Sequence, residues 1–259
     1  MTVLIATAQV GTDASVVYVH VTASDIQGRY ITQLHKEHFK IQEDGKPQDI
    51  VYFSPTDSLI SVGMLVDAHA EVSDRIKATA TAAFLTKDSS PQDQLFVAEL
   101  GNTALNDAIY EGLNKVLQLR NNKRALVLFT DRADPGAYRF AKVKELLRDQ
   151  DVQLYAIAVS QSGTGADVLR DVAELSGGNS FFPSSIASVE NIYKKIAADL
   201  RNQYVIGYRP TNQAQDGKWR KIKVSVEFKD AKQKAHKLRT RAKPGYYAPT
   251  VAGSSAAKN

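Results

Sequence analysis

The strongest constraint on the fold is a regular alternation of short apolar runs and amphipathic stretches between residues 59 and 200. Two of the runs, Ile60–Val66 and Ala125–Thr130, are apolar at nearly every position, which is typical of strands covered on both faces. The stretches between the runs repeat apolar residues at helical spacing, most clearly across Leu105–Leu117. This alternation predicts a doubly wound, mostly parallel α/β sheet with helices on both faces.

The residues on either side of this core follow a strand-like pattern instead. Val17, Val19 and Val21 alternate with more polar residues, and Asp44-Gly45 marks a tight hairpin whose returning strand is predicted at Ile50–Phe53. After the core, further strands are predicted at Tyr204–Tyr208, Lys221–Phe228 and Lys237–Arg241. We expect the two flanks to pair into one small β-sheet or sandwich, with the α/β core inserted between its halves.

These patterns divide the chain into four parts. We predict a β-rich segment at 14–56, the α/β domain at 57–202, a second β-rich segment at 203–248 that pairs with the first, and a disordered tail at 249–259. The chain has no cysteine, which excludes disulfide scaffolds, thiolate metal sites and a cysteine nucleophile. No apolar run reaches the ~18 residues of a membrane span, and no signal peptide is recognisable at the start.

The positive charge is concentrated in one region. The chain has a formal net charge of +5, but Gly217–Lys243 contains eleven Lys or Arg against Glu227 and Asp230, a net +9 that leaves −4 for the remainder. Such a segment is compatible with contact to an anionic surface or polymer. The alternative is a solvated sheet edge whose lysines prevent aggregation, and the alternation with apolar residues favours that alternative. The segment shows no recognition helix, so the sequence does not indicate specific nucleic-acid binding.

Oxygen-rich side chains follow three of the predicted strands. Asp67 follows the first, Thr103 follows the strand at Leu95–Leu100, and Asp131 follows the strand that ends at Thr130. Because ligands bind at the carboxyl ends of parallel strands, we expect these residues to converge. Carboxylate and hydroxyl oxygens around one point are the ligands of Mg²⁺, Mn²⁺ or Ca²⁺.

This arrangement resembles the von Willebrand factor A-type domain. The metal-ion-dependent adhesion site of that family is Asp-x-Ser-x-Ser, a Thr and a Thr-Asp-Gly turn, and it is matched here by Asp67, Thr103 and Thr130-Asp131. The flanks are similar to an exported bacterial subfamily abundant in acidobacteria, through Val17–Thr22, Phe39–Gln48, Gly207-Tyr208, Trp219–Ile222, Arg239–Arg241 and Gly245–Tyr247. The resemblance implies a binding or adhesion module that is exported to the periplasm or cell surface.

The match departs from the family motif at three positions. His69 and Glu71 stand in place of the two serines, and Arg132 stands in place of the glycine after Asp131. One interpretation is a degenerate, metal-free site in which Arg132 pairs with a carboxylate. The other is a rebuilt site in which Asp67, His69, Glu71 and Asp131, with Thr103 at its family position, hold a divalent cation such as Mg²⁺, Mn²⁺ or Zn²⁺. The three departures together favour the degenerate site.

The expected function is therefore binding rather than catalysis. We expect no catalytic residue and no cofactor, and a protein or other macromolecular ligand at Asp67, Thr103, Asp131 and Arg132. Two alternatives remain open. One is a metal-dependent hydrolase that uses the rebuilt Asp/His/Glu site, and the other is a structural module that assembles through its basic β-region.

Overall fold

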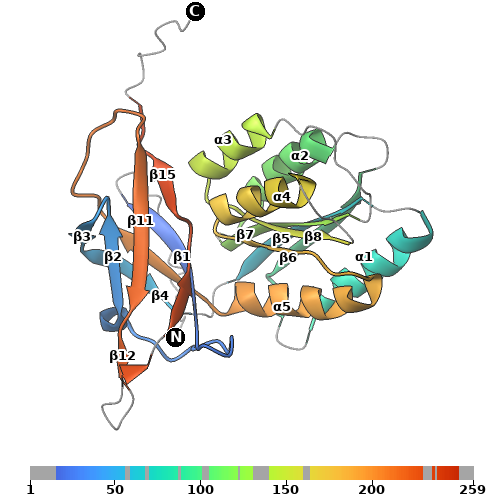
Figure 1. The fold of residues 1–259 in the computed structure, drawn as a ribbon, viewed down its shortest axis with the longest axis horizontal. Coiled ribbons are helices and arrows are strands. Elements are labelled where there is room, and N and C mark those ends of the chain that lie inside the picture. Colours follow the sequence, from blue (N-terminus) through green and yellow to red (C-terminus); the bar gives the residue numbers. More distant parts are fainter. Residues whose placement is uncertain are drawn as a thin grey trace, which may run out of the picture.

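The polypeptide forms two lobes, an α/β lobe and a β lobe, which lie side by side in Figure 1. The computed structural model describes residues 16–55, 59–67, 70–86, 89–100, 105–121, 123–130, 140–159, 164–229, 235–236 and 238–250. No helix within these ranges is both long and apolar enough to cross a membrane. The predicted disordered tail at 249–259 lies almost entirely outside the described residues.

The α/β lobe is built on a five-stranded parallel sheet with the order β6-β5-β7-β8-β9. Its strands are β5 (Ile60–Asp67), β6 (Gln94–Glu99), β7 (Lys123–Thr130), β8 (Gln153–Ala158) and β9 (Asn179–Phe181). The first strand of this sheet in chain order, β5, lies inside the sheet, so the chain winds outward from it in both directions. The sheet is therefore doubly wound, as the alternation of apolar runs and helices predicted.

Helices cover both faces of this sheet (Figure 1). Two of them, α1 (Ala70–Phe84) and α5 (Val189–Arg201), pack on one face, and α2 (Leu105–Leu117), α3 (Ala141–Asp149) and α4 (Thr164–Leu175) pack on the other. Successive side chains of β7 supply the two cores in turn. Val127 and Phe129 enter the α1–α5 core, and Leu126 and Leu128 enter the α2–α4 core, all four with 0% exposure. Burial on both faces explains the unbroken apolar run in the sequence.

The β lobe consists of two four-stranded antiparallel sheets that each combine strands from both ends of the chain. One sheet has the order β14-β1-β10-β4, from Arg239–Arg241, Val17–Ser24, Gln203–Tyr208 and Ile50–Ser54. The other has the order β15-β11-β2-β3, from Gly245–Tyr247, Trp219–Val226, Phe39–Glu43 and Lys46–Gln48. A short ribbon, β12 (Phe228–Lys229) with β13 (Ala235–His236), extends from them, and short 3-10 turns occur at Lys36–His38 and Ile186–Ser188. The predicted pairing of the two flanks is confirmed.

Two details of the β lobe differ from the sequence prediction. The strand that returns from the Asp44-Gly45 hairpin is β3, whereas Ile50–Ser54 crosses over and pairs with β10 in the other sheet. β3 was missed because it is only three residues long and contains Pro47, which breaks the usual strand signal. The basic strand β11 is also not an edge strand, because it lies between β15 and β2. Its lysines therefore cover a sheet face and do not protect an edge.

The β2–β3 hairpin depends on left-handed backbone at both central residues. Asp44 has a φ of 48° and Gly45 a φ of 80°, as a two-residue turn of this kind requires. Because a β-branched side chain is strained in this conformation, Gly45→Val should lower the free energy of unfolding by about 1–2 kcal/mol in urea denaturation. Gly45→Asn is the matched control and should cost less than half as much, because asparagine tolerates the left-handed region. Equal losses for the two variants would contradict this account.

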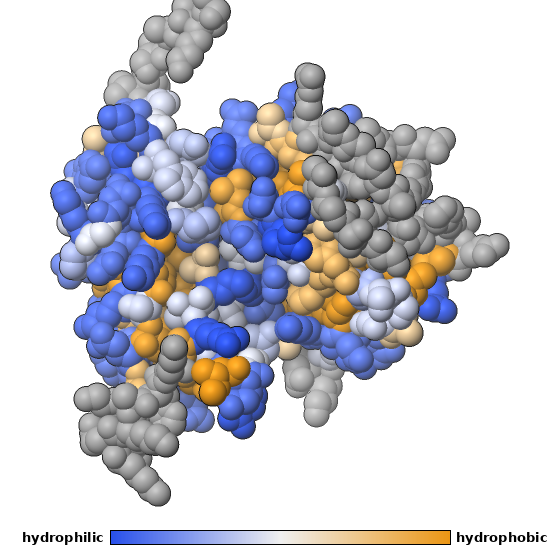
Figure 2. Space-filling view, in the orientation of Figure 1, coloured by the Kyte–Doolittle hydropathy of each residue, from blue (hydrophilic) through white to orange (hydrophobic). Residues whose placement is uncertain are grey.

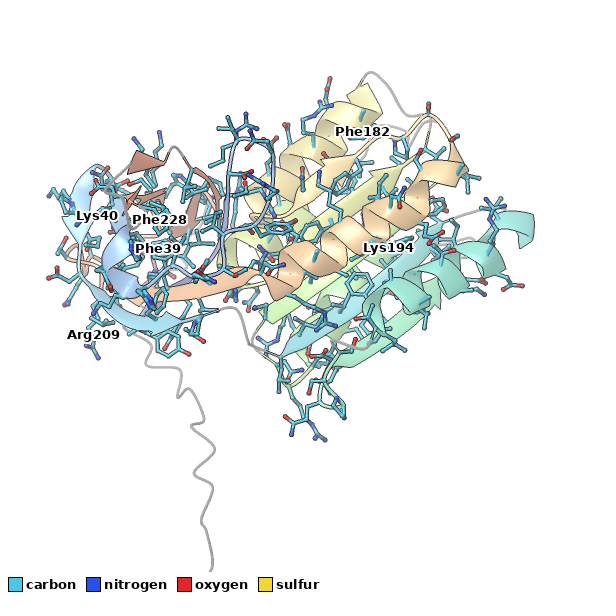
Figure 3. The ribbon with its side chains drawn as sticks, turned by 90° about the horizontal axis from the view of Figure 1, so that it is seen from below. Phe39, Lys40, Phe182, Lys194, Arg209 and Phe228 are labelled. Atoms are coloured by element: carbon cyan, nitrogen blue, oxygen red, sulfur yellow. The ribbon has the colours of Figure 1, made fainter. Side chains whose placement is uncertain are left out.

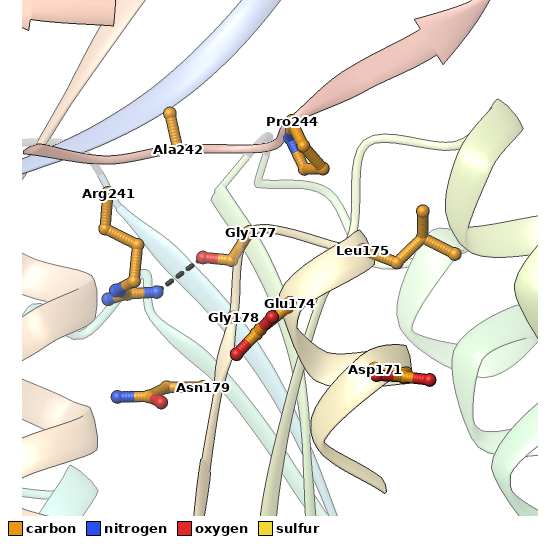
Figure 4. A pocket seen from close by; sticks show the side chains of 9 residues that line it. All are labelled: Asp171, Glu174, Leu175, Gly177, Gly178, Asn179, Arg241, Ala242 and Pro244. Atoms are coloured by element: carbon orange, nitrogen blue, oxygen red, sulfur yellow. Dashed lines mark hydrogen bonds between the residues drawn. The ribbon is translucent and has the colours of Figure 1, made fainter. Parts of the chain in front are cut away.

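A polar network joins the two lobes. The Asp199 carboxylate on α5 accepts hydrogen bonds from Tyr155 Oη of β8 at 2.5 Å, from Thr22 Oγ1 of β1 at 3.3 Å, and from the Arg241 guanidinium of β14. Arg241 also donates to the Gly177 carbonyl, across a cleft of about 540 Å³ (Figure 4). Burial raises the pKa of Tyr155 well above its ordinary value, and the negative charge of Asp199 adds to the effect. Tyr155 therefore stays protonated and donates to Asp199.

Candidate functional site

The carboxyl edge of the parallel sheet brings together the ends of β5 and β7. These strands are neighbours, and their last residues, Asp67 and Thr130, are paired in register. From β5 the chain passes through α1 to β6, which lies on one side of β5. The later strands β7, β8 and β9 lie on the other side. The edge beyond Asp67 and Thr130 is thus the switch point of the sheet, where open α/β folds bind their ligands.

The two side chains at this point contact each other directly. Thr130 Oγ1 donates a hydrogen bond to Asp67 Oδ2 at 2.9 Å, and the residues are only 2% and 4% exposed. A carboxylate with so little exposure requires polar partners, because an uncompensated buried charge is costly. The backbone around the pair is also fixed, since Val159 N–H donates to the Thr130 carbonyl and Leu100 N–H donates to the Val66 carbonyl.

Most of the other predicted site residues cannot be placed relative to this pair. His69, Thr103, Asp131 and Arg132 lie outside the described residues. Glu71 lies in the first turn of α1, but its side chain is not described. The convergence of these residues on Asp67 stays a prediction. Among the described residues, no three His, Asp or Glu side chains are grouped closely enough to hold a metal ion.

A second polar cluster at the same edge was missed by the sequence interpretation. Glu99, the last residue of β6, accepts hydrogen bonds from Ser73 Oγ and from Lys77 Nζ, the latter at 2.6 Å, and Lys77 also pairs with Asp74 at 2.7 Å. Lys77, and then Ser73, hold the pKa of Glu99 below its ordinary value. The i, i+4 spacing of Ser73 and Lys77 on α1 was the available signal. The cluster fixes the start of α1 to the end of β6.

A protein-family model and a solved structure are similar to this chain. Residues 73–195 match the model of the von Willebrand factor type A domain, a span that begins within α1 and so does not include Asp67. Among solved structures, the chain is similar to the ArnB paralog VWA2 from Sulfolobus acidocaldarius, with 12% identity, a TM-score of 0.43, and coverage of 89% of this chain and 76% of that one. No curated protein sequence matches the chain.

Proposed function

From the presence of a von Willebrand factor type A domain at residues 73–195, we propose that the protein is a non-enzymatic, adhesion-type binding module. Its ligand is a protein or other macromolecule, which docks at the carboxyl edge of the sheet around Asp67, Thr103, Asp131 and Arg132. The observation that carries the proposal is the buried contact between Asp67 and Thr130 at the switch point. Ligands of open α/β sheets bind at this position.

The proposed site works without a metal ion or another cofactor. His69 and Glu71 replace the hydroxyls of the family motif, and Arg132 replaces its glycine. A guanidinium beside Asp67 or Asp131 supplies the positive charge that a cation would otherwise bring, and its planar fork suits carboxylate oxygens. An acidic group on the ligand would then be recognised by Arg132 in place of a cation.

The proposed place of action is the bacterial cell envelope, after export. The support is the resemblance of the flanking segments to the exported subfamily, at Val17–Thr22 and Phe39–Gln48 before the domain and at Gly245–Tyr247 after it. The β lobe formed by these segments lies at the amino ends of β7 and β8, where Lys123 Nζ bonds to the Gln203 carbonyl. The carboxyl edge with Asp67 therefore faces away from the β lobe.

A charge-neutral variant of Asp67 tests the proposal. Asp67→Asn keeps an acceptor oxygen for Thr130, so the fold should survive. It removes the negative charge that, in the proposed site, holds the Arg132 guanidinium in place. When the protein is immobilised, the variant should retain about tenfold less envelope protein from the organism that encodes the chain than the wild type does. Asp149→Asn, at an exposed carboxylate at the carboxyl end of α3 and on the side of the β lobe, is the matched control and should retain them normally. Equal retention by the two variants would place the ligand elsewhere on the molecule.

Metal content separates the degenerate site from the rebuilt metal site. We expect elemental analysis to find well below one equivalent of metal, and Mg²⁺, Mn²⁺, Zn²⁺ or EDTA to leave the melting temperature unchanged. Stoichiometric metal, or several degrees of stabilisation by one of these cations, would establish the rebuilt site instead. Chelator-sensitive hydrolytic turnover would then favour the hydrolase.

A further inference from the structure

The second feature of interest is the solvent-facing side of the β15-β11-β2-β3 sheet, far from the carboxyl edge. On β11 the inner positions Arg220, Ile222 and Val224 are buried, whereas Lys221, Lys223 and Ser225 are exposed. Trp219 lies on the same face of β11 as Lys221 and Lys223 and is half-buried. This side, which we call the outer face, also includes Lys40 of β2 and Tyr247 of β15. The surface over these strands is largely hydrophilic in Figure 2.

Three lysines form an unpaired row on the outer face. Lys221 and Lys223 are two residues apart on β11, about 6.8 Å along the strand, and Lys40 lies on β2 directly opposite Ser225. Lys40 points away from the core, whereas its neighbour Phe39 points into it (Figure 3). Within the described part of the chain, none of these lysines forms an ion pair. The nearest acids along these strands are Asp44, whose carboxylate accepts the Lys221 N–H at 2.9 Å, and Glu227, which follows β11.

An aromatic platform continues this row at its other end. The indole of Trp219 lies against Gly245, where a Cβ would come within 2.5 Å of the ring, so the ring lies across the backbone of β15. Tyr247 packs against it edge-on, with ring centroids 5.2 Å apart, and the Arg148 guanidinium lies 5.3 Å from the Tyr247 ring. Trp219, Lys221 and Lys223 thus follow one another on alternate positions of one strand.

We propose that the outer face binds an anionic polysaccharide. A sugar ring of the polymer stacks on Trp219, and carboxylate groups on the following sugars pair with Lys221, Lys223 and Lys40. The charge of the face is complementary to such a chain, since Lys40, Lys221 and Lys223 outnumber the two nearby acids, Asp44 and Glu227.

Two other polyanions fit the outer face less well. Single-stranded nucleic acid is bound by aromatic side chains that alternate with cations along the path of the strand, whereas here both aromatic rings lie at one end. Binding to an anionic membrane would gain only about 1 kcal/mol for each surface lysine. Trp219 is packed against Gly245 and does not extend from the surface, so it is not placed to insert into a membrane.

Trp219 provides a direct probe because it is the single tryptophan of the chain. Titration with polygalacturonate should change its fluorescence saturably, whereas neutral dextran of the same length should not. The paired substitution Lys221→Gln/Lys223→Gln should weaken binding about tenfold, and raising NaCl from about 50 to 500 mM should weaken wild-type binding. The control pair Lys142→Gln/Lys194→Gln removes the same charge from exposed positions on α3 and α5 and should leave the titration unchanged.

Calorimetry with Trp219→Ala completes the test, because fluorescence is lost in that variant. Polygalacturonate binding should fall at least about tenfold, while the paired lysine variant provides an independent result if Trp219→Ala folds poorly. The proposal is overturned if polygalacturonate does not bind, if dextran binds equally, or if the two lysine pairs behave alike. Tighter binding of a single-stranded oligonucleotide or of anionic phospholipid vesicles than of polygalacturonate would also overturn it.

Discussion

Replacing Arg241 with methionine should lower the free energy of unfolding by about 3 kcal/mol. The substitution leaves Asp199, which is 6% exposed, without its cationic partner at the junction of the two lobes. Tyr155 and Thr22 still donate to the carboxylate, but neither carries a charge that offsets it. Because a domain of ordinary stability has only about 5–15 kcal/mol in total, urea denaturation should detect this loss clearly.

Two further variants show whether the loss comes from the unpaired carboxylate. Arg170→Met removes an exposed arginine that pairs with Asp167 at 2.6 Å, and it should cost no more than about 0.5 kcal/mol. Adding Asp199→Leu to Arg241→Met should recover part of the lost stability, because it removes the buried charge that Arg241 had compensated. A loss at Arg241 as small as that at Arg170 would mean that the network does not hold the lobes together.

The sequence predicted the α/β lobe well because strands that are buried on both faces need apolar side chains at nearly every position. The run Ala125–Phe129 is apolar throughout because both faces of β7 are covered. Asp44-Gly45 indicates its hairpin because few other residues accept positive φ. The polar network around Asp199 that joins the two lobes has no comparable sequence pattern. In the sequence, Asp199 looks like any polar residue of an amphipathic helix. Arg241 lies 42 residues later, in a segment whose many lysines and arginines suggest a basic surface. Only the tertiary fold brings them together.

The candidate site was predictable at the level of the sheet edge but not at the level of contacts. Because parallel strands end at the same edge, the position of Asp67 follows from the order of strands and helices alone. The hydrogen bond from Thr130 does not follow from it: the sequence interpretation included Thr130-Asp131 in the motif match but assigned no contact to the Thr130 hydroxyl. The register that pairs Asp67 with Thr130 is set by the packing of β5 against β7, which no local pattern encodes.

The packing of β7 therefore supports both the fold and the site, and its truncation should have the largest effect on stability. Phe129 is 0% exposed in the α1–α5 core and immediately precedes Thr130. Phe129→Ala should cost about 3–5 kcal/mol, because the central strand cannot collapse to fill the cavity. Phe182→Ala is the matched control. That ring is half-buried at the periphery of the other core, beneath the Arg170 guanidinium at 5.1 Å, and its loss should cost less than half as much in urea denaturation. Equal losses would mean that the two faces of the sheet are not packed as tightly around β7 as its burial indicates.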